Sequence, residues 1–247
     1  ATNRGRDFEA PLDRSMGSVE VEDQLVGLDY LKNLDFVDAD RVGIWGWSYG
    51  GYMTLMTTLQ APGEFAAGVA GAPVTDWSLY DTAYTERYMD TPQSNAEGYE
   101  QGSVFAHLDG YETPLLLIHG MADDNVIFAN SVRLYSQMQE RRYPFEMMTY
   151  PGQRHGVRGE DRQVHLWTMI FDYFDRTLNA YLLDGDHARF LNHSAEPNLD
   201  FATPDGSGIA LRDIAPGEEI LCDYGQFMQD VVLLPTPVRL AAMQPGA

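Results

Sequence analysis

Apolar side chains recur at the spacing of an α-helix in several stretches of this 247-residue chain. In residues 18–34 and 127–142 they fall every three or four positions, with polar side chains between them. Residues 52–59 form a shorter run of the same kind. Residues 161–178 carry the longest stripe, which is formed by Val164, Trp167, Phe171, Phe174 and Leu178. The pattern predicts four helices, with these five side chains aligned on one side of the last.

Short continuous apolar runs alternate with the predicted helices. They cover residues 41–46, 66–74, 113–120 and 144–152, and their length and flanking Gly or Pro are typical of buried strands. Such an alternation predicts an α/β fold, in which helices cover both faces of a parallel sheet. After about Leu178 the segments shorten, and Gly, Pro and Asp become frequent. We therefore divide the chain into residues 1–178, a segment without helical periodicity over 179–230, and a Pro-interrupted tail over 231–247.

Gly46, Ser48 and Gly50 form the pattern Gly-x-Ser-x-Gly between a predicted strand and a predicted helix. This is the context of a nucleophile elbow, in which a sharp turn exposes the serine and small neighbours let strand and helix approach closely. The backbone N–H of Tyr49, the next residue, would then face a developing oxyanion. Because five residues often match by chance, the pattern needs support from a base and an acid elsewhere in the chain.

Two later loops supply candidates for the acid and the base. Asp123 and Asp124 follow the strand predicted at 113–120, and His155 follows the strand predicted at 144–152. Serine, acid and histidine occur in this order in the α/β-hydrolases. Taken singly, the aspartates could form an ordinary polar turn and His155 could be a surface residue. The joint pattern favours a catalytic triad, whereas His119, at a strand end, is interpreted as structural.

Longer motifs around these residues resemble the prolyl oligopeptidase family of serine peptidases, specifically its dipeptidyl peptidase IV branch. The matching stretches are GSVEVEDQ, GWSYGGYM, GAPVTDWSLYDTAYTERYMD, LLIHGMADDNV and the HG of residues 155–156. The resemblance covers residues 1–178. It implies a peptide substrate, with Ser48 as the nucleophile, Asp123 rather than Asp124 as the acid, and His155 as the base.

The same resemblance implies a substrate-binding role for six further residues. The pocket for proline at the second position of the substrate would be formed by Val74, Trp77, Tyr80 and Tyr84. The substrate would also be contacted by Asn125 and Val126. Aromatic and branched walls suit a flat apolar ring. Without the resemblance, the aromatic residues would be interpreted as core packing.

The resemblance also implies that the chain carries only part of the family's catalytic domain. Its first residues would follow the fourth of eight sheet strands, so that a tyrosine oxyanion donor and a β-propeller lie outside this sequence. The expected fold is therefore a partial α/β-hydrolase. The strand before Ser48 would have an unpaired edge, which favours self-association. Loss of one oxyanion donor costs roughly 10²–10³ in rate, so we expect impaired activity for the chain alone.

A second resemblance concerns about residues 183–227. The stretches ARFLNHSAEPN and RDIAPGEEILCDYG resemble the C-terminal core of SET-domain protein-lysine methyltransferases. It implies that Asn192 and His193 lie at an S-adenosylmethionine site and that Tyr224 lines a lysine channel, while Ala195 stands where many members have a zinc-binding cysteine. The chain would then be a natural fusion, a gene-model error or an engineered product. The alternatives to peptidase activity are methyl transfer and a catalytically inactive fusion. For the segment itself, the alternative to a SET-like fragment is a β-rich appendage whose Asn, Pro and Gly merely make turns.

Composition restricts the classes of binding partner and the compartments that fit this chain. A formal net charge of -21, with Lys32 as the single lysine, disfavours nucleic-acid binding. The chain has no run of eighteen apolar residues that would predict a membrane-spanning helix, and residues 1–15 show no apolar core of a signal peptide. The single Cys222 cannot form an internal disulfide. We therefore expect a soluble protein and leave cytoplasm and periplasm both open. The peptidase resemblance implies a peptide substrate and no metal or cofactor, and S-adenosylmethionine enters only under the methyltransferase alternative.

Overall fold

A computed structural model describes residues 5–178, together with residues 192–193, 196, 198–200, 209–212 and 221–222. The chain divides into two compact units, residues 1–182 and residues 183–247. Each unit is described by itself. In the described residues, no helix is both long enough and apolar enough to cross a membrane.

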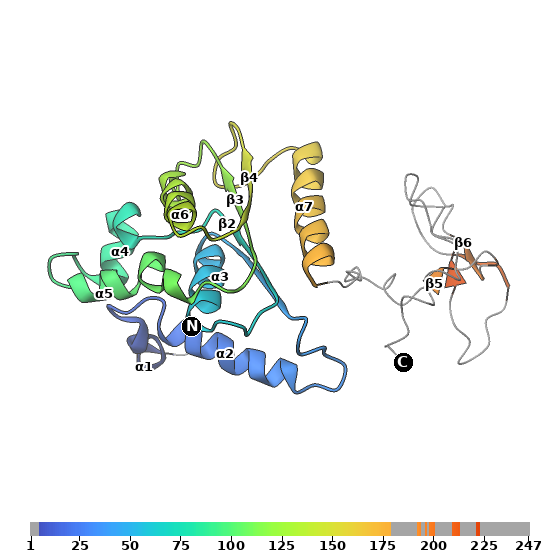
Figure 1. The fold of residues 1–247 in the computed structure, drawn as a ribbon, viewed down its shortest axis with the longest axis horizontal. Coiled ribbons are helices and arrows are strands. Elements are labelled where there is room, and N and C mark those ends of the chain that lie inside the picture. The colour runs from blue at the N-terminus through green and yellow to red at the C-terminus, as the bar shows by residue number, and fades with distance from the viewer. Residues whose placement is uncertain are drawn as a thin grey trace. The chain divides into compact units, whose positions relative to one another are not determined.

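The first unit is built on a parallel sheet whose strands follow the predicted order. Its described strands are β1 (Gly43–Trp47), β2 (Ala67–Gly71), β3 (Leu115–Gly120) and β4 (Glu146–Tyr150), and they lie in the sheet in the order β1-β2-β3-β4 (Figure 1). Each neighbouring pair is parallel. Consecutive strands are therefore neighbours, and the loops that follow them gather at one edge of the sheet.

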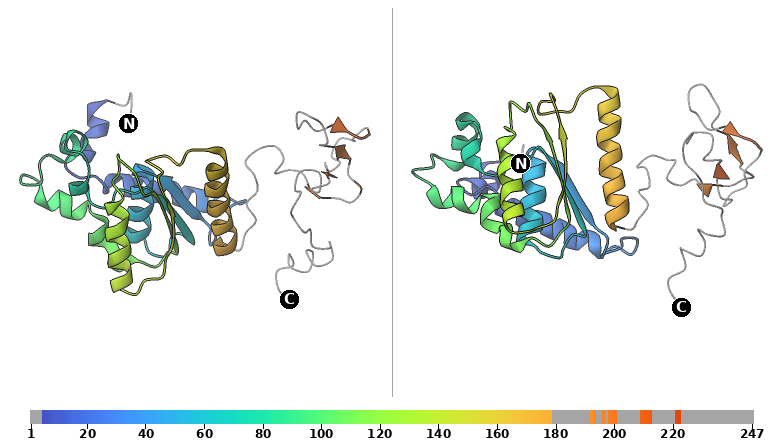
Figure 2. Two further views of the ribbon diagram at one scale, coloured as in Figure 1. Left: turned by 90° about the horizontal axis from the view of Figure 1, so that it is seen from above. Right: turned by 45° about the horizontal axis from the view of Figure 1, so that its top comes forward.

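Helices cover both faces of this sheet, as the alternating pattern predicts. The α-helices are α1 (Arg6–Glu9), α2 (Val19–Lys32), α3 (Tyr49–Gln60), α4 (Thr82–Met89), α5 (Ala96–Gln101), α6 (Ala129–Glu140) and α7 (Glu160–Leu178), and the 3₁₀ helices are η1 (Ala10–Leu12), η2 (Trp77–Leu79) and η3 (Val104–Gly110). Figures 1 and 2 place α3 and α6 on one face and α7 on the other. The first unit is a partial α/β-hydrolase sheet with its flanking helices.

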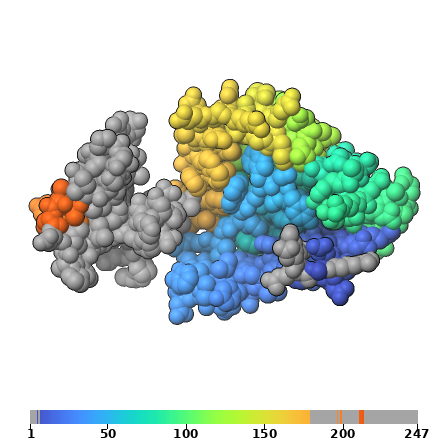
Figure 3. Space-filling view, turned by 180° about the vertical axis from the view of Figure 1, so that it is seen from behind, coloured from blue at the N-terminus to red at the C-terminus, as the bar shows by residue number. Residues whose placement is uncertain are grey.

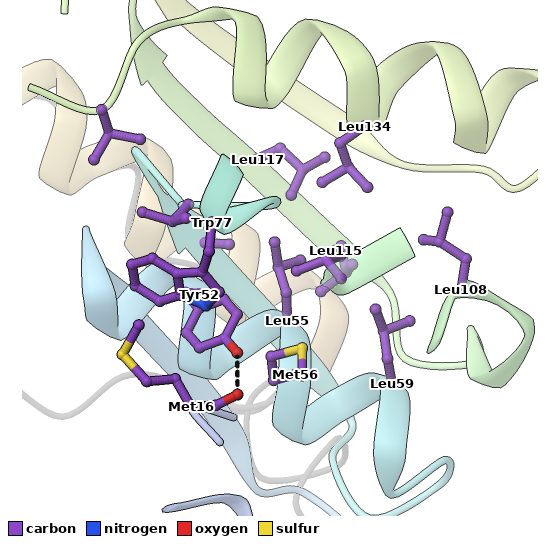
Figure 4. Packing of buried hydrophobic residues seen from close by; sticks show 14 of the residues in the cluster. Met16, Tyr52, Leu55, Met56, Leu59, Trp77, Leu108, Leu115, Leu117 and Leu134 are labelled. Carbon is purple, nitrogen blue, oxygen red and sulfur yellow. Dashed lines mark hydrogen bonds between the residues drawn. The ribbon is translucent and has the colours of Figure 1, made fainter. Parts of the chain in front are cut away.

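Alternation along β3 divides the core into two clusters, one on each face. Leu115 and Leu117 pack with the side chains of α3 and α6, whereas Leu116 and Ile118 pack with those of α7. Successive side chains of a strand point to opposite faces, so a continuous apolar run serves both clusters. Figure 4 shows the first cluster around Tyr52, whose hydroxyl donates to the carbonyl oxygen of Met16 at 3.1 Å.

The N-terminal segment lies beside α4 and α5, far away in sequence. Figure 3 shows the dark-blue segment that precedes α2 against the green surface of residues 80–100. Arg14 forms an ion pair with Asp90, and its carbonyl oxygen accepts a hydrogen bond of 2.9 Å from the side chain of Asn95. These contacts hold the segment before α2 against the end of α4 and the start of α5.

The face of α7 that packs on the sheet differs from the predicted stripe. The buried residues are Leu166, Ile170 and Tyr173, and Phe174 and Leu178 are only partly buried. Val164, Trp167 and Phe171 are 62%, 40% and 43% exposed. Apolar residues cover a wide arc of this helix, so their spacing alone could not select the side that meets β2 and β3.

The strand β1 lies at the edge of the described sheet, as the sequence led us to expect. Its Trp45 is 45% exposed and meets the ring of Trp167 edge to face, with 5.2 Å between centroids. We call Trp45, Val164, Trp167 and Phe171 the outer flank. It is an apolar surface beside an edge strand, the kind of surface that favours association.

The second unit contains short described strands: β5 (Asn192–His193), β6 (Leu199–Asp200), β7 (Ile209–Ala210) and β8 (Leu221–Cys222). They pair in the order β5-β8-β6-β7. The described part of this unit is therefore β-structured, in contrast to the α/β organisation of the first.

Candidate active site

The turn between β1 and α3 holds Ser48 in an unusual backbone conformation. Its φ is 62° and its ψ is -119°, a region that non-glycine residues rarely adopt. The N–H of Ser48 donates to the carbonyl oxygen of Gly71 at 2.8 Å. Strain of this kind persists where the surroundings fix the backbone, and it often marks a functional residue.

Glycines make this turn possible. A Cβ added to Gly46 would lie 2.3 Å from the carbonyl oxygen of Gly50, and one added to Gly51 would lie 2.5 Å from the carbonyl oxygen of Gly71. Neither position has room for a side chain, because the first turn of α3 lies directly against β1 and β2. The two glycines are therefore required by the close approach of strand and helix.

Ser48, His155 and Asp123 come together although the chain separates them widely. His155 Nε2 lies 2.9 Å from Ser48 Oγ, and His155 Nδ1 lies 2.8 Å from Asp123 Oδ2. An ionised carboxylate only accepts hydrogen bonds, so Nδ1 carries the proton and Nε2 is free to accept the Ser48 hydroxyl proton. The convergence predicted from the sequence is confirmed in the geometry.

The two adjacent aspartates have opposite environments. The Asp123 side chain is 0% exposed, and its Oδ1 accepts the N–H groups of Asn125 at 2.9 Å and Val126 at 3.0 Å. The Asp124 side chain is 59% exposed and pairs with Arg154 at 2.6 Å. Only Asp123 contacts His155, so the geometry selects it as the partner of the imidazole.

An aromatic cluster begins at the residue after Ser48. Tyr49, Tyr80 and Tyr84 surround Trp77, with ring centroids 5.8, 6.0 and 6.1 Å from that of Trp77. The Tyr80 hydroxyl donates to the side-chain oxygen of Asn125 at 2.6 Å. Burial raises the pKa of Tyr80 and of Tyr84 above the usual range, so both keep their hydroxyl protons.

Burial separates the predicted substrate-binding residues into two groups. Val74, Trp77 and Val126 are 2%, 1% and 0% exposed and belong to the core, whereas Tyr80 and Tyr84 are half-buried. Core packing therefore accounts for the first group by itself. The half-buried tyrosines present ring surface that a ligand could contact.

Glu20 is a contact of this region that the sequence did not single out. Its carboxylate accepts a hydrogen bond from the Tyr49 hydroxyl and further hydrogen bonds from the backbone N–H groups of Gly17 and Ser18, both at 3.1 Å. Burial first, and then Glu20, raise the pKa of Tyr49 far above its usual value. An acidic residue in the first turn of α2 is common, because it suits the helix dipole. The contact with Tyr49 could not be predicted, because it depends on the packing of α2 against α3.

The N–H of Tyr49 is placed to serve an oxyanion. Tyr49 is the first residue of α3, and N–H groups of a first helical turn have no carbonyl partner within the helix. Their dipole also favours negative charge. The position next to Ser48 is where a tetrahedral intermediate would develop that charge.

Comparisons with known proteins cover this first unit. A family model described as "Prolyl oligopeptidase family" matches residues 1–180. Dipeptidyl peptidase 8 of Homo sapiens is 45% identical over 182 residues, which are 72% of this chain and 20% of that protein. A probable dipeptidyl-aminopeptidase B of Neurospora crassa is 39% identical over 198 residues, 78% of this chain and 21% of that protein. The chain thus spans about a fifth of the length of these relatives.

The SET-like resemblance receives no support from these comparisons. The family match ends at residue 180, before Asn192 and His193. In the structure these two residues form β5, and their side chains lie outside the described part of the chain. Tyr224 also lies outside it. The S-adenosylmethionine site and the lysine channel implied by the resemblance thus fall on side chains outside the described part of the chain.

The fold leads to the same conclusion as the sequence match. The crystal structure of Porphyromonas gingivalis dipeptidyl peptidase 4 aligns with a TM-score of 0.69 and 38% identity over 70% of this chain and 25% of that one. A putative dipeptidyl aminopeptidase IV from Bacteroides ovatus aligns with the same TM-score at 40% identity, over 71% of this chain and 25% of that one. With its elbow serine, its parallel sheet and a family match across residues 1–180, the chain belongs to the prolyl oligopeptidase family.

Proposed function

We propose that this chain carries the catalytic triad of a serine peptidase of the dipeptidyl peptidase type. The observation that carries the proposal is the continuous contact from Ser48 Oγ through the His155 ring to Asp123 Oδ2, at 2.9 and 2.8 Å. Both distances lie in the range of hydrogen bonds that can pass a proton. Membership of a peptidase family and the names of the relatives support the same activity.

The reaction would proceed by acyl transfer through Ser48. His155 Nε2 takes the hydroxyl proton while Oγ attacks the peptide carbonyl, and the N–H of Tyr49 stabilises the resulting oxyanion. The imidazolium then gives its proton to the leaving amine, and an acyl-enzyme remains. Water, activated by His155 in the same way, releases the acid product. Asp123 holds the imidazole in the required tautomer, and no metal or cofactor enters the reaction.

The proposed substrate is a peptide with proline at the second position. Tyr80 and Tyr84 offer half-buried ring surface near the buried Trp77, and their centroids are 5.3 Å apart at an angle of 88°. Such walls suit a flat apolar ring. The relatives are dipeptidyl peptidases by name, which supports the cleavage of dipeptides from a chain end.

We expect low activity for this chain alone. It spans about a fifth of its relatives, and within the described residues Tyr49 is the oxyanion donor that we identify. Removal of one oxyanion donor lowers the turnover of a serine peptidase by roughly 10²–10³. The proposed activity is therefore best measured first by covalent labelling of Ser48, which needs the nucleophile and base but not full turnover.

The test compares two peptidyl phosphonate probes, one with proline and one with bulky leucine at the reacting position. Wild type should be labelled by the proline probe, and Ser48→Ala should not be labelled by either. A matched control, Ser78→Ala, changes an exposed serine and should leave labelling unchanged. Labelling that persists in Ser48→Ala would refute the nucleophile, and equal rates with both probes would refute the proline pocket.

We also propose that the chain associates with itself through the β1 edge and the outer flank. Among the described strands β1 pairs only with β2, so the N–H and C=O groups on its other side can pair with a further strand. The exposed rings of Trp45 and Trp167 lie beside it. Sedimentation velocity of the purified chain should show a concentration-dependent dimer, and a single monomeric species at high concentration would refute this proposal.

A further inference from the structure

A second histidine lies against the carboxylate of the triad. His119, near the end of β3, is 0% exposed, and its ring packs edge to face on Phe128 with centroids 5.5 Å apart. Its Nε2 lies 3.2 Å from Asp123 Oδ2, the same oxygen that His155 contacts. The proposed mechanism assigns no step to this ring.

The neighbours of His119 determine which nitrogen carries its proton. Nε2 lies 2.9 Å from the carbonyl oxygen of Val126, which can only accept a hydrogen bond. The proton must therefore be on Nε2, where it faces both Val126 and Asp123. Nδ1 is then unprotonated and accepts a hydrogen bond of 2.7 Å from the Ser131 hydroxyl. Burial lowers the pKa of His119, so the ring stays neutral in this tautomer.

His119 thereby completes the set of donors around Asp123. The Oδ1 atom accepts two backbone N–H groups, from Asn125 and Val126. The Oδ2 atom accepts from the two histidines, one in the core and one beside Ser48. If His119 were removed, Oδ2 would keep His155 as its single partner among these four donors, and the carboxylate could turn about its Cβ–Cγ bond.

We propose that His119 is a positioning residue, whose Nε2–H holds Asp123 Oδ2 in the direction of His155. This inference rests on the proposed function of the triad. It also ties the acid to the backbone of Val126, since one proton lies between both oxygens. Val126 is followed by α6, which carries Ser131, so the helix, the loop at Val126 and the acid are held by one ring.

Two amide variants separate this role from simple core filling. In His119→Gln the amide nitrogen falls near the position of Nε2 and can donate to Asp123. In His119→Asn the shorter side chain falls near Nδ1, where its oxygen can accept from Ser131 but no donor reaches Asp123. Both variants place one neutral amide in the same buried site. If His119 only filled space in the core, the two variants should therefore have similar effects on the triad. Ser131→Ala is a control that leaves the Nε2–H in place.

The decisive measurement is the proton NMR resonance of the hydrogen between His155 Nδ1 and Asp123, which moves far downfield in a short charged hydrogen bond. We expect this resonance in wild type, His119→Gln and Ser131→Ala, and its loss or a large upfield shift in His119→Asn. Labelling of Ser48 by the proline phosphonate should be roughly 10- to 100-fold slower in His119→Asn, the scale of one hydrogen bond to a charged group. His119→Gln should recover most of that rate.

Failure of this inference is distinguishable from failure of the proposed function. If wild type is not labelled, the peptidase proposal fails, while the NMR comparison still decides the role of His119. The inference is overturned if His119→Asn keeps both resonance and rate, or if His119→Gln and His119→Asn lose both equally. Near-ultraviolet circular dichroism identifies any variant that has lost its packing, in which case the remaining amide variant and Ser131→Ala decide.

Discussion

The carboxyl edge of the sheet and the outer flank differ in how their groups are satisfied. At the carboxyl edge, the buried Asp123 receives N–H groups from two backbone positions and two histidines. On the outer flank, Trp45 and Trp167 contact each other, yet both remain at least 40% exposed. The comparison teaches that the triad is held by contacts within this unit, whereas the flank offers surface that the described residues do not cover.

The largest effect should come from the carboxyl edge itself. Asp123→Asn keeps the shape of the acid but removes the acceptor that fixes the His155 tautomer, so labelling of Ser48 should fall by roughly 10³–10⁴. The control Asp124→Asn changes the exposed neighbour, which pairs with Arg154, and should stay within about twofold. Equal losses in the two variants, measured as second-order labelling rates, would remove the distinction between them.

A glycine exchange tests whether the elbow is as tightly packed as its geometry indicates. In Gly46→Ala the new Cβ would meet the Gly50 carbonyl, and the free energy of unfolding should fall by roughly 2–3 kcal/mol. Gly27, in the middle of α2, has open space around it. Gly27→Ala should therefore raise the same quantity by roughly 0.5–1 kcal/mol. Urea denaturation followed by circular dichroism gives both values, and a Gly46→Ala protein as stable as wild type would contradict the close approach.

The buried histidine predicts a pH dependence of stability. Burial lowers the pKa of folded His119 below its ordinary value of 6.5, so the unfolded chain binds its proton first as pH falls. Asp123 and His155 are the ionisable groups that face the ring. The contribution of neutral His119 to the free energy of unfolding is complete above about pH 6.5. It is lost as the pH falls below that value, by at most about 1.4 kcal/mol per pH unit.

The comparison that isolates this contribution is wild type against His119→Asn in urea titrations from pH 7.5 to 5.5. The difference in stability between the two proteins should narrow as the pH falls. A constant difference across the range would show that the pKa of His119 is not lowered in the folded protein.

The smallest effect is expected on the outer flank. Trp167→Ser removes an exposed ring, so the free energy of unfolding should change by less than about 1 kcal/mol, while self-association weakens by roughly tenfold. Thr168→Ser, at an exposed neighbouring position, is the matched control and should leave both unchanged. Sedimentation equilibrium measures the association, and an unchanged dimer constant in Trp167→Ser would exclude the flank from the interface.

Local pattern was sufficient for most of the first unit. The apolar runs predicted the positions of β1 to β4 to within a few residues, and the alternation with helices predicted the parallel sheet. Ser48 could be found because the Gly-x-Ser-x-Gly pattern is a local requirement of a tight strand-to-helix turn. These features depend on residues that are close together in the chain.

Other features depended on partners that are distant in sequence. From the residues alone Asp123 and Asp124 were equivalent, and the family resemblance was needed to choose between them. The structure separates them because only Asp123 turns inward to His155. Glu20 carries no local signature of its contact with Tyr49, since the two residues meet through the packing of α2 on α3. His119 lies only four residues before Asp123, but the apolar pattern of the strand does not show where its ring points.

The amino-acid sequence by itself determined the order of β1 to β4 and of α2, α3, α6 and α7, the elbow around Ser48 and the residue types of the triad. Each follows from short-range periodicity or steric demand. Only the tertiary structure decided that α7 buries Leu166, Ile170 and Tyr173 while Trp167 and Phe171 remain exposed. The physical reason is that periodicity shows which sides of a helix are apolar, whereas the side that is buried depends on the surface it meets. The same holds for the contact between Asp123 and His155, because the loop after β4 brings the imidazole to a carboxylate 32 residues away.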